Sequence, residues 1–279
     1  MPFSARPWPL VVCLPLCLAV CVAAAAAPDD DELVAGLVPY ELPADTNDIT
    51  SLTPKQAKIM LASFGGVHTV EFVLRDNRRV TTYGLPLNGL QTLSADTAKV
   101  LARGFRPNGV NQGQGVLALN GLTQLEADAA RVLATSRATT LFLNGLPTLS
   151  ADAAAAITRF KGQITLDGLA TLSPEAARAL AQAPGWDGWL PGVVSFEAPD
   201  SVAVAAALAA HRGPLCLPNL KRISAKTLSA LIAKEDVEIP LIEYLELIPE
   251  PDGSENDDFV VPPGFQARQE RERLEKRQR

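Results

Sequence analysis

Apolar and polar residues follow one recurring pattern along most of the chain. Four clear copies begin at 85, 117, 141 and 164, and read "LPLNGLQTLSADTAKVLA", "LALNGLTQLEADAARVLA", "LFLNGLPTLSADAAAAIT" and "ITLDGLATLSPEAARALA". Their glycines lie 32, 24 and 23 residues apart, at Gly89, Gly121, Gly145 and Gly168. Weaker copies occupy 49–62, 194–209 and 215–233. A repeat of this length predicts an array in which every unit stacks on its neighbours.

Each copy is predicted to form a strand, a turn and a short helix. Leu141 and Leu143 alternate with Phe142, so the leucines should face the core and Phe142 the opposite side. Burial of Phe142 would indicate a register shifted by one residue. We expect Gly145 to end the strand, because glycine accepts the backbone angles of a tight turn. Serine or threonine then caps the helix, at Thr53, Ser94, Ser150, Ser173 and Ser224.

A single unit cannot bury its leucines, whereas stacked units share one continuous core. Neighbouring strands lie about 4.8 Å apart, but neighbouring helices need roughly 10 Å. The row of strands must therefore be shorter than the row of helices. The sequence predicts an α/β fold with parallel strands on a concave side and short, alanine-rich helices on a convex side.

The unit "LxLxGLxxLSxDAAxxLA" resembles the bacterial leucine-rich-repeat-like proteins with alanine-rich helices. The resemblance covers about 49–247 and implies a right-handed solenoid that binds rather than catalyses. The common leucine-rich repeat reads "LxxLxLxxNxL", whereas here a polar residue directly follows the second strand leucine. These residues either form a buried ladder or, as we favour, serve as turn residues before glycine; they are Asn88, Asn120, Asn144 and Asp167.

The first 27 residues have the pattern of a secretory signal peptide. Arg6 precedes an apolar run from Leu10 to Ala27 that ends in alanines. An uncleaved membrane anchor and a lipid anchor on Cys21 are the alternatives. We therefore expect a secreted, periplasmic or cell-envelope protein.

Four further segments follow the expected signal peptide: an acidic segment at 28–48, the repeats at 49–247, an acidic linker containing Pro and Gly at 248–265, and a charged, net basic tail at 266–279. The tail favours helix but has no apolar stripe, so we expect a frayed and solvated helix. The alternative is an electrostatic contact with an anionic membrane or envelope surface.

Composition excludes several function classes. The net charge of −6 becomes −7 without residues 1–27, which argues against a general nucleic-acid binder. Outside those residues Cys216 is the only cysteine, so no internal disulfide is expected. No catalytic or metal-binding motif occurs, and we expect no enzyme, cofactor or metal. The enzymatic alternative is a hydrolase-like site in inserted loops near His68 or His211.

We expect an unknown protein or peptide to bind on the concave face. The positions between inward leucines should point out of it, at Pro86, Ala118, Phe142, Thr165, Ser195 and Cys216, flanked by Val116, Thr140, Gln163, Val193 and Pro214. This surface is small, weakly polar and uncharged, which suits a polypeptide rather than phosphates. A purely structural spacer without any partner is the other alternative.

Six residues are the candidates for partner binding: Thr140, Phe142, Gln163, Thr165, Trp186 and Trp189. Phe142 is the only large residue expected on the concave face. The two tryptophans belong to a predicted insertion, "APGWDGWLPG" at 183–192. They either anchor a partner or, as we favour, fold back over the helices.

Overall fold

The computed structural model describes residues 45–63, 69–73, 79–105, 115–250 and 259–278. The expected signal peptide, Cys21 and His68 lie outside these residues. The described chain is an α/β protein in which strands and helices alternate, and most strand pairs are parallel. Within these ranges, no helix has the length and apolar character needed to cross a membrane.

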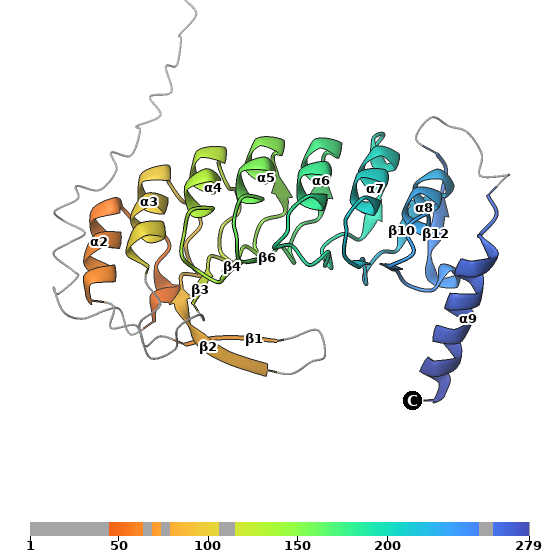
Figure 1. Ribbon diagram of the computed structural model, residues 1–279, viewed down its shortest axis with the longest axis horizontal. Helices are drawn as coiled ribbons and strands as arrows, with labels where there is room; N and C mark the ends of the chain where they lie inside the picture. The colour runs from red at the N-terminus through yellow and green to blue at the C-terminus, as the bar shows by residue number, and fades with distance from the viewer. Residues whose placement is uncertain (1–44, 64–68, 74–78, 106–114, 251–258, 279) are drawn as a thin grey trace, which may run out of the picture.

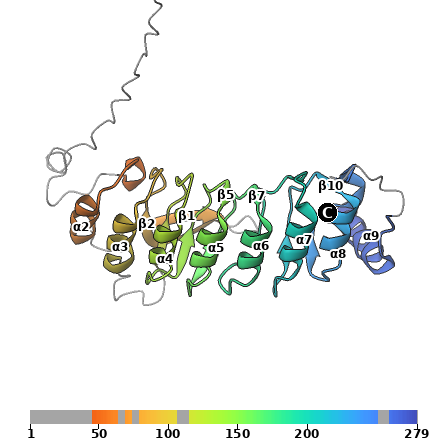
Figure 2. The same cartoon turned by 90° about the horizontal axis from the view of Figure 1, so that it is seen from above.

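The helices form one row above a layer of strands (Figure 1). In chain order the row contains α2 (Pro54–Ser63), α3 (Ala95–Gly104), α4 (Ala127–Leu133), α5 (Ala151–Ile157), α6 (Pro174–Ala181), α7 (Ser201–Ala209) and α8 (Ala225–Ile232). Each helix packs on the next one, and Figure 2 shows the same order from above. A last helix, α9 (Pro263–Gln278), lies across the far end of the row. Two 3-10 turns complete the helical elements, η1 (Thr46–Asp48) and η2 (Ile242–Tyr244).

The strands form two rows. The first row contains β2 (Arg79–Pro86), β3 (Val116–Ala118), β4 (Thr140–Phe142) and β6 (Gln163–Thr165), and later β9 (Leu215–Cys216) and β11 (Val237–Glu238). The second row contains β5 (Thr148–Leu149), β7 (Thr171–Leu172), β8 (Ser195–Phe196), β10 (Arg222–Ser224) and β12 (Glu246–Ile248). Pairing within both rows is parallel. The exception is β1 (Thr69–Val73), which forms an antiparallel hairpin with β2.

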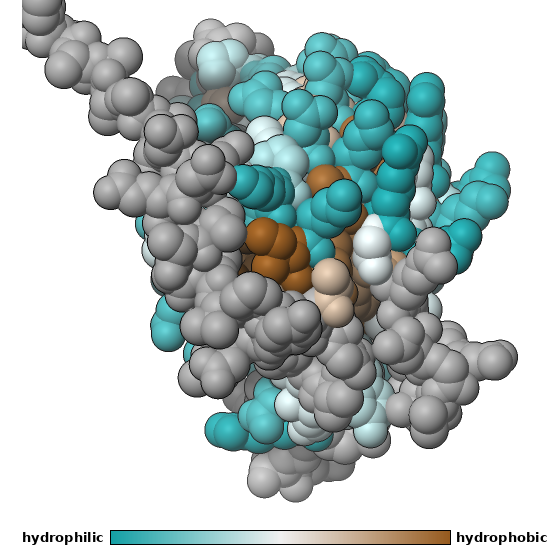
Figure 3. All heavy atoms as spheres, turned by 90° about the vertical axis from the view of Figure 1, so that its left-hand side faces the viewer, coloured by the Kyte–Doolittle hydropathy of each residue, from teal (hydrophilic) through white to brown (hydrophobic). Residues whose placement is uncertain are grey.

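The repeated leucines fill the space between helices and strands, as the sequence predicts. Leu141 and Leu143 are both 0% exposed and belong to the main core. The predicted caps are also confirmed, because the Ser150 side chain accepts the N–H of Ala153. The side chains of Ser94, Ser173 and Ser224 each accept the backbone N–H three residues later in the same way. At the α2 end, apolar side chains are visible inside a mostly hydrophilic surface (Figure 3). The core therefore reaches this end of the array.

The asparagines after the strands form a ladder from repeat to repeat. The Oδ1 atom of Asn88 accepts the N–H of Asn120 at 3.3 Å, and that of Asn120 accepts the N–H of Asn144 at 3.0 Å. Asn144 likewise accepts the N–H of Asp167 at 3.0 Å, and Asn47 begins the series by accepting the N–H of Asn88 at 3.1 Å. The favoured interpretation as turn residues alone is therefore wrong. Asn47 also places the first rung inside the predicted 28–48 segment.

The glycine after each ladder residue is required by close stacking. A β-carbon on Gly121 or Gly145 would overlap the carbonyl oxygen of Asn88 or Asn120, one repeat earlier. Of the described glycines, only Gly188 has a positive φ, 75°. The expectation that turn angles select these glycines is therefore corrected, because the backbone of the preceding turn leaves no space for a side chain.

The predicted insertion at 183–192 contains the first-row strand positions of its own repeat. Trp186 forms an isolated bridge with Ile164, and Trp189 forms one with Cys216. Asp187 and Gly188 lie between them as two extra residues, and the positive φ of Gly188 accommodates this bulge. The expectation of a loop outside the repeat is therefore wrong.

This shift also corrects two predicted positions on the concave face. Ser195 pairs with Arg222 in the second strand row. Val193 is buried in the main core, and its N–H donates to the carbonyl of Leu190. Leu169 donates to the carbonyl of Leu166 in the same way one repeat earlier. The prediction placed both residues wrongly because this repeat lacks the Gly-Leu pair used for alignment.

Candidate functional site

The first strand row has one face toward the helices and one face away from them, which we call the strand face. Period-2 alternation places Phe142 and Thr165 on the strand face, opposite the core leucines. Their register partners Pro86 and Ala118 share this side. The strand face consists of two halves with different surroundings.

The β1–β2 hairpin covers the half formed by β3 and β4. Val70 of β1 clusters with Val116, Ala118 and Phe142, separately from the main core. Phe142 is only 5% exposed, so the prediction that it is exposed is wrong. Its burial does not indicate a register shift, because Leu141 and Leu143 still face the core. Figure 1 shows the hairpin on the side of the strands opposite the helices.

The other half of the strand face stays open beyond β4. Gln163, Asp236 and Glu238 are exposed, while Thr165 and Trp189 are half-buried. We call these five residues the open strip. The strip carries two carboxylates, although the sequence predicts an uncharged surface. Thr140 is half-buried at the boundary between the two halves.

The open strip contains three of the six candidate residues, Gln163, Thr165 and Trp189. Trp186 is 3% exposed and part of the main core, as the favoured interpretation of the tryptophans predicts. Trp189 instead holds a strand position beside Cys216. Cys216 is buried beneath the strip, and its Sγ donates to Oε2 of Glu238 at 3.0 Å.

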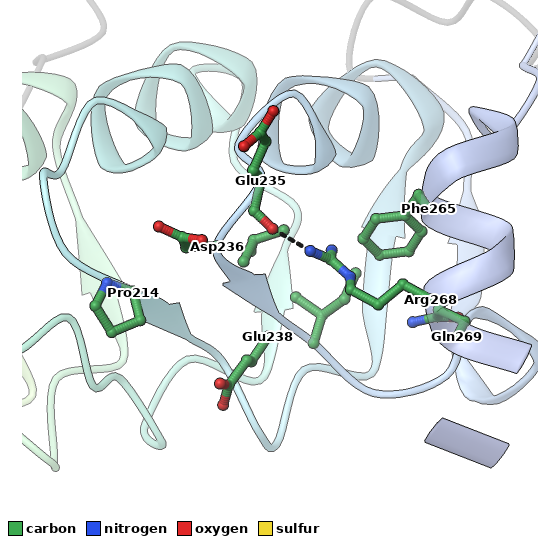
Figure 4. Close-up of a pocket in the computed structure, with 9 residues that line it drawn as sticks. Pro214, Glu235, Asp236, Glu238, Phe265, Arg268 and Gln269 are labelled. Carbon is green, nitrogen blue, oxygen red and sulfur yellow. Dashed lines mark hydrogen bonds between the residues drawn. The ribbon is translucent and has the colours of Figure 1, made fainter. Parts of the chain in front are cut away.

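The open strip ends at a strand edge beside a cavity. Leu215 and Leu217 donate their N–H groups to the carbonyls of Asp236 and Glu238. In a parallel pair this directs the N–H and C=O of Val237 away from β9, toward the outer edge. A cavity of about 440 Å³ borders that edge, lined by Pro214, residues 235–239, Phe265, Arg268 and Gln269. Figure 4 shows α9 as its far wall.

Helix α9 is docked at its first turns, so the prediction of a frayed, solvated helix is wrong there. Phe265 is buried in the main core, and the Arg268 guanidinium lies 4.6 Å above its ring. Arg268 donates to the carbonyl of Glu235, and Gln269 accepts the N–H of Ile242 at 2.8 Å. The helix begins at Pro263, inside the predicted linker, because proline is favoured at a first helical position.

His211 contacts a backbone carbonyl and an aromatic ring. Its Nδ1 lies 3.3 Å from the carbonyl oxygen of Ala181, and its ring centroid lies 4.8 Å from that of Trp186. Burial lowers the pKa of His211, opposed by the hydrogen bond to Ala181, while Lys234 lowers this pKa further and Asp187 raises it. In the part of the chain that the structure describes, no group of three His, Cys, Asp or Glu side chains is arranged to hold a metal ion.

Comparisons with protein-family models, with curated proteins and with solved structures find no match to this chain. The resemblance to leucine-rich-repeat-like proteins therefore depends on the repeat pattern alone. The open strip and the strand edge beyond it are the candidate functional site.

Proposed function

We propose that this chain is a right-handed leucine-rich-repeat solenoid of the secreted or envelope-associated kind, which binds an extended polypeptide and catalyses no reaction. Its strand face would be the concave side, and the open strip would be the binding surface. The asparagine ladder and the parallel strand rows support the solenoid. The single observation that carries the function is the end of the open strip, where the exposed carboxylates of Asp236 and Glu238 lie at the outer edge of β11 beside a cavity.

The chemistry of the open strip favours a partner with basic side chains. Asp236 and Glu238 are exposed carboxylates on adjacent positions of one strand face, and complementary charge favours specific association. Trp189 can receive a Lys or Arg side chain on its ring. The outward N–H and C=O of Val237 can pair with one residue of an extended chain. The partner we propose is therefore an extended, basic peptide segment.

Charge reversal tests this proposal directly. Peptides rich in Lys and Arg should be among those selected from a displayed library on the wild-type protein. Asp236→Lys combined with Glu238→Lys should weaken their binding at least about tenfold, because truncating or reversing charges at an interface costs affinity. Asp152→Lys with Glu175→Lys is the matched control, since both carboxylates are exposed on the helix side. Equal binding by the strip variant and the wild type would refute the proposal.

The two alternatives give different results in the same experiment. A purely structural spacer selects no peptide above background. An enzyme whose site lies near His211 would still select peptides in the strip variant but would lose selection when His211 is replaced. Affinity capture from the native extracytoplasmic fraction would then identify the natural partner.

A further inference from the structure

Both strand rows are interrupted between the repeats of α6 and α7. The ladders that end at β6 and β7 do not continue, because β8 of the next repeat pairs with β10, and β9 of the repeat after it pairs with β11. An isolated bridge between Ile164 and Trp186 crosses the interruption. The bulge at Asp187 and Gly188 lies at the same junction. Fewer main-chain hydrogen bonds therefore join the two groups of repeats here than elsewhere.

A groove of about 1330 Å³ lies at this junction, between α6 and α7. On the α7 side it is lined by Ala203, Ala206, Ala207 and Ala210. Three of these alanines are exposed, because methyl groups are too short to fill the space. The lining contains none of the five residues of the open strip, so the groove is a separate surface.

Trp186 gives this groove a polar group that needs a partner. The side chain lines the groove, yet its Nε1 is a buried donor without an acceptor among the described residues. Buried tryptophan N–H groups normally have a partner. His211 lies beside the indole, and burial lowers its pKa, which favours the neutral ring. With Nδ1–H directed at Ala181, Nε2 of a neutral imidazole is an acceptor.

The groove is also more basic than the rest of this acidic chain. Arg178 and Arg212 line it and are exposed. Asp187 is the one acidic lining residue, and its Oδ1 accepts the N–H of Trp189 at 3.2 Å. An indole N–H and a neutral imidazole nitrogen match the C=O and N–H of a peptide group, and the guanidinium groups match carboxylates.

We propose that this groove binds a peptide segment with acidic side chains, whose carbonyl accepts from Trp186 Nε1 and whose carboxylates pair with Arg178 and Arg212. The site is independent of the open strip and selects the opposite charge. One chain would then hold two segments of different composition.

Titration of the single-tryptophan protein tests this proposal. Trp8→Phe with Trp189→Phe leaves Trp186 as the only tryptophan, which can be excited selectively over tyrosine at long wavelength. The probe is an acetylated, amidated peptide of alternating Ala and Glu. We expect a saturable change with this peptide and none with the matching Ala–Lys peptide. Arg178→Glu with Arg212→Glu should weaken binding about tenfold or more. Arg137→Glu with Arg159→Glu, at exposed arginines of earlier repeats, should leave it within about twofold.

A second variant separates binding from folding. Trp186→Phe removes the indole N–H but keeps an aromatic ring, so calorimetry should detect roughly fivefold weaker binding of the Ala–Glu peptide. The smaller ring leaves some space in the core and lowers stability, but it breaks no internal hydrogen bond, so circular dichroism well below the unfolding temperature should detect an unchanged fold. Equal binding of both peptides, undiminished binding by either groove variant, or equal weakening by the control arginines would each overturn the proposal.

Discussion

The two halves of the strand face are built by the same kind of repeat but differ in what lies over them. In the first half Val116, Ala118 and Phe142 point away from the core and meet Val70 of the hairpin. In the second half the corresponding side includes Gln163 and Glu238, which remain exposed. The strands also differ in continuity, because one ladder joins β2 through β6 whereas β9 and β11 pair separately. In the first half the apolar outward positions therefore make an internal contact, whereas in the second half Gln163 and Glu238 leave an accessible surface.

The largest effect should come from removing the contact that distinguishes the halves. Phe142→Ala leaves a cavity beneath the hairpin, and truncation of a buried phenylalanine costs about 3–5 kcal/mol. Gln163→Ala, at an exposed position on β6, should change the free energy of unfolding by less than about 0.5 kcal/mol. Urea unfolding of both variants measures the difference. Equal destabilisation would mean that the two halves are covered alike.

The two halves also differ in the hydrogen bonds that stabilise the turns after the strands, because the asparagine ladder does not extend through both. It runs from Asn47 to Asp167, so it joins the repeats of the first half and reaches the first strand of the second half. In the second half Asn219 instead donates its Nδ2 to the carbonyl of Pro191 at 2.9 Å from an exposed position. The turns are thus stabilised by different hydrogen bonds.

Asn120→Ala should cost about 1–3 kcal/mol, because the N–H of Asn144 loses its acceptor in a part-buried site. Asn219→Ala is the matched control and should cost less than about 0.5 kcal/mol, since water can replace an exposed bond. The free energy of unfolding from urea titrations checks both values. A control as costly as Asn120→Ala would contradict the special role of the ladder.

A residue's role could be predicted from the sequence where that role depends on its own repeat. The burial of Leu141 and the capping role of Ser150 follow from local spacing. The burial of Phe142 could not be predicted in this way, because it depends on a hairpin that lies far away in sequence from β4. A usable signal did exist, since two alternating runs flank "RDN" near 75–77.

The candidate site was only partly predictable for related reasons. Asn-Gly pairs suit a turn and a ladder equally, so only the neighbouring repeat decides between them. The absence of a Gly-Leu pair concealed the strand positions of Trp186 and Trp189, which shifted Ser195 to the wrong row. The place of Asp236 and Glu238 on the strand face could not be predicted, because their strand lies after the last recognisable copy of the pattern.

The smallest effect should come from pH, and it should originate in the second half. Burial lowers the pKa of His211 in the folded protein below its ordinary value of 6.5. The unfolded chain then binds more protons than the folded chain, so stability is fully present above about pH 6.5 and decreases as the pH falls below it. The urea midpoint should be lower at mildly acidic pH than at neutral pH. In His211→Gln the difference between these two midpoints should be smaller. Phe142→Ala serves as the control, because it lowers stability at every pH without altering the titration of His211. An undiminished pH dependence in His211→Gln would assign the linkage to other groups.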